Sequence, residues 1–185
     1  MDLKEVLSLF GIMSVESIEQ INKSAWSINQ KYILKKNTDL RQLAKSISLS
    51  DFLLKAGVPA PKYLKTLDEK NYIQADDFYY CLMQKINGHH FDPYEGNAYK
   101  NGCILGEVVA NLHLALKTAL VDFDFYDSNA IQELSGWVLG EITNKNIPIP
   151  QEIIHYCYEL EAIYLTLPRQ LIHRDMHLEN MLFYN

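Results

Sequence analysis

The sequence predicts an α+β chain with a strand-rich first lobe and a helical second lobe, and three observations support this class. Up to about Met83, short β-branched and aromatic runs alternate with polar turns around one main helix, which is typical of strands. Beyond that point, apolar residues recur at the helical period of about three to four residues. Near the end of the chain, a polar loop over residues 173–180 separates two short apolar runs. We therefore expect a first lobe over residues 1–83, then a hinge and a partial helical lobe over residues 84–185.

In the first lobe, apolar spacing predicts a helix over residues 2–10 and a second, main helix over residues 39–56. A change of phase near residues 48–50 suggests a bend, or two short helices, in the main helix. A polar turn within residues 28–32 indicates a hairpin between two strands in the 17–36 stretch. Further strands are expected over residues 63–67, 72–74 and 78–83.

In the second lobe, wide apolar stripes predict helices over residues 101–119, 129–142 and 151–167. Pro150 stands where a helix tolerates proline, at its start. We expect His89 and His90 to lie in an exposed polar loop that follows the join between the lobes.

Composition limits the classes of function. The chain has 185 residues and a net charge of −6, which argues against nucleic acid or an anionic membrane as its main partner. Cys81, Cys103 and Cys157 form no CxxC pair, so we expect reduced and mostly buried thiols. No apolar run reaches membrane-spanning length, and the first residues lack the features of a signal peptide, so we expect a cytoplasmic protein.

A lysine follows the apolar triplet of the 31–36 strand. Because strand neighbours alternate, Lys35 and Lys36 should lie on opposite faces of the sheet. A lysine on such a strand is the group that nucleotide-dependent kinases use to hold the α- and β-phosphates. The alternative is that both are solvated surface lysines, because a single motif of this kind is weak.

The loop over residues 173–180 contains a carboxylate, Asp175, and an amide, Asn180, separated by four residues. This order suits phosphoryl transfer, in which the carboxylate accepts the proton of an attacking hydroxyl and the amide oxygen holds magnesium. A rival interpretation uses the same residues. On an extended strand, His173, Asp175 and His177 would share a face and could form the metal triad of a hydrolase.

Five segments then occur in a recognisable order, namely 32–35, 54–61, 82–88, 105–113 and 172–180. With them, the chain resembles the aminoglycoside phosphotransferase and choline kinase-like family, the small-molecule branch of the protein-kinase-like fold. The resemblance implies an ATP- and Mg²⁺-dependent phosphotransferase whose partners are the nucleotide and a small molecule that carries a hydroxyl. It also implies a protein-kinase-like arrangement of the strand-rich and helical lobes.

The resemblance also implies a role for individual residues. Lys35 would hold the nucleotide phosphates. Asp175 would be the catalytic base, Asn180 a magnesium ligand and His173 a support of the loop, whereas His177 has no clear role. The hinge whose backbone meets the adenine would consist of Met83, Gln84, Lys85 and Ile86.

The sequence departs from the family pattern in three places. One is Arg174 in the loop, where this family more often has glycine. The helix turn around Ser46 has no acid to pair with Lys35, and no second metal-binding aspartate follows the loop before Asn185. We therefore expect this chain to be an inactive fragment, truncated after the catalytic loop, with an uncovered apolar face that favours self-association. The alternative is a non-catalytic binding or structural protein on a kinase-like scaffold.

Overall fold

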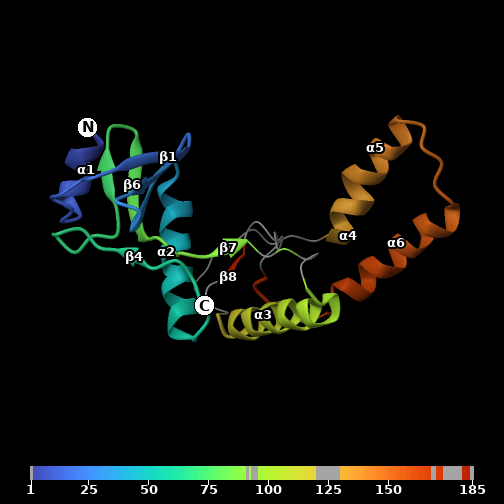
Figure 1. The fold of residues 1–185 in the computed structure, drawn as a ribbon. Helices are drawn as coiled ribbons and strands as arrows, with labels where there is room; N and C mark the ends of the chain where they lie inside the picture. Colours follow the sequence, from blue (N-terminus) through green and yellow to red (C-terminus); the bar gives the residue numbers. More distant parts are fainter. Residues whose placement is uncertain are drawn as a thin grey trace. The chain divides into compact units, whose positions relative to one another are not determined.

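The structure of the protein is a computed structural model that describes residues 2–90, 92, 96–119, 130–167, 170–172 and 181–183. The chain divides into two compact units (Figure 1), of which the first contains Met1–Phe123 and Leu171–Asn185 and the second contains Asp124–Gln170. The predicted lobe boundary at residues 83 and 84 falls inside the first unit, and it stays a prediction.

The first unit is organised around an antiparallel six-stranded sheet with the order β1-β2-β3-β6-β4, in which β5 also pairs with β6. The strands that the sequence predicted up to Met83 are present, so the strand-rich first part is confirmed. Their bounds are β1 Ile18–Asn22, β2 Ala25–Ile28, β3 Tyr32–Asn37, β4 Tyr63–Leu64, β5 Ile73–Ala75 and β6 Phe78–Gln84.

The predicted hairpin joins β2 to β3 through Asn29, Gln30 and Lys31. The first two adopt left-handed backbone conformations with φ of 50° and 54°. Such a pair matches the right-handed twist of the two strands. The Asn29 side chain accepts hydrogen bonds from the backbone N–H groups of Glu16 (2.8 Å) and Ser17 (3.0 Å) and donates one to the Ser14 carbonyl (2.8 Å). The turn therefore fixes the segment that leads into β1.

Helix α1 (Leu3–Leu9) covers one face of the sheet, and Val6 and Leu7 on it are completely buried. The Leu67 N–H also donates to the Leu9 carbonyl at 2.9 Å, which ties the end of α1 to the loop between β4 and β5. The core on this face contains Val6, Leu7, Phe10, Ile28, Leu34, Ile73, Ala75, Tyr80 and Leu82.

Helix α2 (Leu40–Lys55) packs on the opposite face, as Figure 1 shows, where Leu43 and Ile47 meet Cys81. Its first turn is capped by the Asp39 carboxylate, which accepts from a backbone N–H at 3.0 Å. The helix is continuous, so the division into two short helices near residues 48–50 is wrong. The phase changes there because Ser50 is buried and donates its hydroxyl hydrogen bond to the Pro61 carbonyl.

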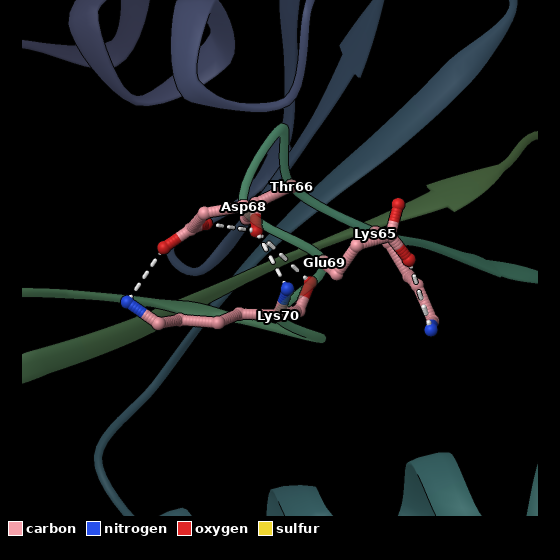
Figure 2. A network of polar contacts seen from close by, with 5 residues as sticks. All are labelled: Lys65, Thr66, Asp68, Glu69 and Lys70. Atoms are coloured by element: carbon pink, nitrogen blue, oxygen red, sulfur yellow. Dashed lines mark hydrogen bonds and ion pairs between the residues drawn. The ribbon is translucent and has the colours of Figure 1, made fainter.

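The predicted strand over residues 63–67 ends early, because a polar turn begins at Thr66 (Figure 2). The buried Thr66 hydroxyl donates to Asp68 at 2.6 Å and accepts from the Lys70 N–H at 2.9 Å. Ion pairs join Asp68 to Lys70 at 2.6 Å and Lys65 to Glu69 at 3.1 Å. The hydrogen bond from the Lys70 side chain is the main cause that lowers the pKa of Asp68.

After the sheet, β7 (His89–His90) pairs with β8 (Leu182–Phe183), a segment from near the end of the chain. The expectation of a loop at these two histidines is therefore wrong, although both remain exposed. Gly88 is needed here because a Cβ atom at its position would lie 2.8 Å from the Phe183 carbonyl oxygen. Helix α3 (Ala98–Thr118) follows, with Asn97 as its N-terminal cap.

The second unit is helical, as predicted. Its first helical run consists of α4 (Ala130–Glu133), a π-helical stretch η1 (Leu134–Val138) and α5 (Leu139–Asn144). Helix α6 (Gln151–Tyr164) starts directly after Pro150 and lies against α4 and η1. None of the helices in the described ranges is both long enough and apolar enough to cross a membrane.

Candidate functional site

Lys35 lies on the α2 face of the sheet. It is opposite Ala25 of β2 and Cys81 of β6, and its side chain is exposed. The neighbouring Lys36 points to the α1 face, where its ammonium lies 4.4 Å from the centre of the Phe78 ring. The predicted alternation is therefore present, and the two lysines have different surroundings.

The groups nearest to Lys35 in the sheet are neutral. Burial raises the pKa of Cys81 to about 11, and the nearby Lys35 ammonium opposes that shift only in part. The Asn37 amide donates to the Cys81 sulfur at 3.7 Å. None of the buried residues of α2 is acidic; they are Leu43, Ile47 and Ser50.

The described residues form no ion pair with Lys35. The sequence indicated that the helix turn around Ser46 has no acid to pair with Lys35. The buried face of α2 agrees, because it contains no carboxylate. With no carboxylate of a described residue paired to it, the exposed Lys35 ammonium is available to attract an anion.

The predicted hinge begins where β6 ends. The Gln84 N–H donates to the Lys62 carbonyl at 2.9 Å, and the Lys85 N–H donates to the Lys31 carbonyl at 2.8 Å. The Ile86 N–H makes no hydrogen bond to a described residue. Of these three amides, that of Ile86 is therefore the one that could donate to a ligand.

Ser27 is a polar residue on the same face that the sequence reasoning missed. It pairs with Ile33 of β3, which in turn pairs with Met83, the first residue of the predicted hinge. Its side chain is only 4% exposed, and no described residue or backbone group hydrogen-bonds its hydroxyl oxygen. Alternation along β2 could have placed it on the Lys35 face, but its burial could not have been read from a short strand.

The loop residues His173, Asp175, His177 and Asn180 lie outside the described residues. The roles proposed for them as base, magnesium ligand, loop support or metal triad therefore stay predictions. Among the residues that the structure does describe, no group of three or more His, Cys, Asp or Glu side chains could hold a metal ion. The chain that follows the loop enters β8, which is held by β7 just beyond the hinge.

A sequence profile described as the phosphotransferase enzyme family matches residues 20–185, which is most of the chain. No curated protein sequence matches the chain significantly.

Solved structures similar to this one are small-molecule kinases. Amicoumacin kinase hAmiN, solved with AMP-PNP, Ca²⁺ and Ami, has a TM-score of 0.64 at 15% identity over 100% of this chain and 61% of its own. Spectinomycin phosphotransferase APH(9)-Ia, solved with ADP and spectinomycin, has a TM-score of 0.56 at 15% identity over 99% of this chain and 64% of its own. The APH(2")-IIa complex with streptomycin and ATP has a TM-score of 0.57 at 15% identity over 100% of this chain and 67% of its own.

These likenesses confirm the α+β, protein-kinase-like fold. The chain spans 61% and 64% of the length of the first two of these structures.

Proposed function

Because the chain belongs to the phosphotransferase enzyme family, we propose that it acts in an ATP-dependent transfer of phosphate to a hydroxyl of a small molecule. The observation that carries this proposal is the position of Lys35. It is an exposed cation on the α2 face of the sheet, one strand from β6, which runs into the predicted hinge. A nucleotide needs both a cation for its phosphates and a backbone donor for its base.

The residues on this face fit a nucleotide. Lys35 would hold the phosphates, and the Ile86 N–H would donate to the base. Asn180 would be a ligand of Mg²⁺, which when bound would neutralise charge on the phosphates. The proteins in the similar structures were solved with AMP-PNP and Ca²⁺, with ADP, or with ATP, which supports a nucleotide and a divalent ion here.

Asp175 would accept the proton of the acceptor hydroxyl as its oxygen bonds to the γ-phosphorus. The bond from that phosphorus to the bridging oxygen breaks, so the products are a phosphate ester and ADP. The similar structures contain antibiotics, and a net charge of −6 on this chain suits a cationic acceptor of that kind. The supply of ATP would make the cytoplasm the place of reaction.

A second candidate function is nucleotide binding without catalysis. The observation that favours it is that the buried residues of α2, namely Leu43, Ile47 and Ser50, include no carboxylate, and that no described residue forms an ion pair with Lys35. A lysine that no acid orients would bind phosphate but would be placed less accurately for transfer. Exposed apolar side chains of the second unit, such as Trp137 (65%) and Tyr156 (57%), would favour self-association in either case.

The experiment compares Mg²⁺-ATP binding with phosphoryl transfer to hydroxyl acceptors, in the unaltered chain and in two variants. Asp175→Asn should abolish transfer and keep ATP binding, because the base acts on the acceptor and not on the nucleotide. His177→Ala should retain both. If the unaltered chain binds ATP and transfers nothing, the second candidate describes the chain as given. If His177→Ala loses activity together with a bound transition metal, the hydrolase interpretation replaces both.

A further inference from the structure

We propose that helix α6 carries a docking seam for an amphipathic helix of another protein, and that this partner helix has basic residues beside its apolar stripe. The seam consists of Ile153, Tyr156, Leu160 and Ile163. It belongs to the second unit, and the inference does not depend on the proposed transfer of phosphate.

The first observation is the spacing of the four seam residues. They follow one another at intervals of three, four and three residues, which is the spacing of the first and fourth positions of a heptad. A helix turns by about 100° per residue, so the four side chains fall within about 80° of arc on one side of α6. The other exposed apolar residues of this helix, Tyr158 and Leu165, lie on the far side and form only an isolated pair.

The second observation is the exposure of the seam. Its residues are large and apolar, yet their exposed fractions in chain order are 50%, 57%, 47% and 55%. A different side of α6 packs on α4 and η1, and it contains buried Cys157 with partly buried Ile154 and Tyr164. The seam is thus a second apolar side that the described residues leave uncovered. An apolar stripe at this spacing is the surface with which one helix docks on another.

The charge around the seam selects the kind of helix. Glu152 and Glu159 flank the seam on the side away from the packed face, and α6 contains no Lys or Arg. His155 of α6 can offset part of this charge when protonated, because its Nε2 lies 3.1 Å from Glu159 Oε1. Over residues 130–167 the chain has five glutamates and one lysine, so the described part of the second unit is acidic throughout. A helix with Lys or Arg beside its apolar stripe is therefore the complementary partner.

A second copy of this chain is a less favourable occupant of the seam. In an antiparallel pair of α6 helices the same flanks face each other, so Glu152 of one copy would meet Glu159 of the other. In a parallel pair the acidic flank would meet the flank that contains Cys157, which offers no cation. Like charges that face each other across an interface oppose association.

The test titrates the unaltered chain with three synthetic peptides of about three heptads, each able to form one helix. The first has Leu at the seam-facing positions and Lys beside them, the second has Glu in place of Lys, and the third has Ser in place of Leu. Calorimetry at about 0.15 M salt should show binding of the first peptide, and binding of the other two that is roughly tenfold weaker or more. Equally tight binding of the second peptide would overturn the choice of a basic partner, and equally tight binding of the third would overturn the role of the seam.

Substitutions in the chain locate the contact. Leu160→Ala should weaken binding of the Lys peptide by about four- to twelvefold, because it removes half-exposed apolar surface from the seam. Leu165→Ala is the matched control, because Leu165 is 59% exposed at the end of the same helix but lies on its far side. Glu159→Lys should lower the preference for the Lys peptide over the Glu peptide by about two- to tenfold. The same change at exposed Glu141 on α5 should leave that preference unaltered.

Circular dichroism melting curves without peptide check the fold of each variant. Equal losses of affinity in Leu160→Ala and Leu165→Ala would overturn the inference, and so would an unaltered chain that binds none of the peptides. Sedimentation of the chain alone tests the second copy as occupant. A dimer that Leu160→Ala dissociates, and that the Lys peptide does not displace, would assign the seam to a second copy instead.

Discussion

The two adjacent lysines of β3 allow a reciprocal test, in which Lys35→Ala and Lys36→Ala should impair different properties. Lys35 is exposed on the face assigned to the nucleotide, and no described residue forms an ion pair with it. Lys36 lies on the α1 face, with its ammonium 4.4 Å from the Phe78 ring and 6.0 Å from the Trp26 ring. The first change should therefore affect ligand binding, and the second should affect stability.

The sizes of the two effects follow from the contacts. A hydrogen bond to a charged group contributes about 1.5–3 kcal/mol, so Lys35→Ala should weaken ATP binding by roughly ten- to 150-fold. It should change the free energy of unfolding by less than about 0.5 kcal/mol, as for other surface substitutions. Lys36→Ala loses its contacts with two rings, which are worth about 0.5–2 kcal/mol of unfolding free energy. Its ATP affinity should stay unchanged.

Isothermal titration with Mg²⁺-ATP measures the first property, and urea unfolding measures the second. Each variant is the control for the other, because both remove the same charge and the same side-chain volume from one strand. Equal losses of ATP affinity in the two variants would refute the assignment of faces. A loss of affinity in Lys36→Ala alone would place the nucleotide on the α1 side of the sheet.

Four further predictions test the framework around the site. Gly88→Ala should separate β7 from β8 and lower the melting temperature, because the new Cβ would lie 2.8 Å from a carbonyl oxygen of β8. Leu7→Ala should lower the free energy of unfolding in urea by about 2–5 kcal/mol, because Leu7 is fully buried. Leu9 is 43% exposed, so Leu9→Ala should lower it by about 1 kcal/mol or less. Equal losses would mean that α1 does not cover the sheet. A thiol reagent at pH 8 should modify exposed Cys103 quickly and Cys81 only on unfolding, because burial raises the pKa of Cys81 to about 11. Since its ordinary value is 9.0, stability should fall as pH rises from about 9 to about 11, as urea titrations would show.

Local sequence signals predicted the first unit well where one strand or one turn decides the outcome. The alternation of Lys35 and Lys36 follows from strand geometry alone, and the hairpin at Asn29 follows from a polar pair between two apolar runs. The sequence also indicated that no acid near Ser46 would pair with Lys35. Helix α2 was predicted within one residue at each end, although it is one continuous helix and not two short ones.

Long-range contacts explain what the sequence could not show. His89 and His90 become a strand because they pair with Phe183 and Leu182, and nothing near the histidines marks a partner so far along the chain. The hydroxyl of Ser27 is buried in the folded chain, so its lack of a hydrogen-bond partner among the described residues emerges only in three dimensions. The Ile86 N–H also stands out only in three dimensions. The N–H groups of the two preceding residues, Gln84 and Lys85, donate to backbone carbonyls of other segments.

The central claim is that a nucleoside triphosphate binds on the α2 face of the sheet. Titration of the isotope-labelled chain with Mg²⁺-ATP, followed through backbone amide chemical shifts in NMR spectra, tests it most directly. We expect saturable shifts at Ser27, Lys35 and Ile86, and none at Val6 or Leu7 of α1, which covers the other face. Shifts confined to α1, or no shift anywhere at millimolar ATP, would contradict the claim.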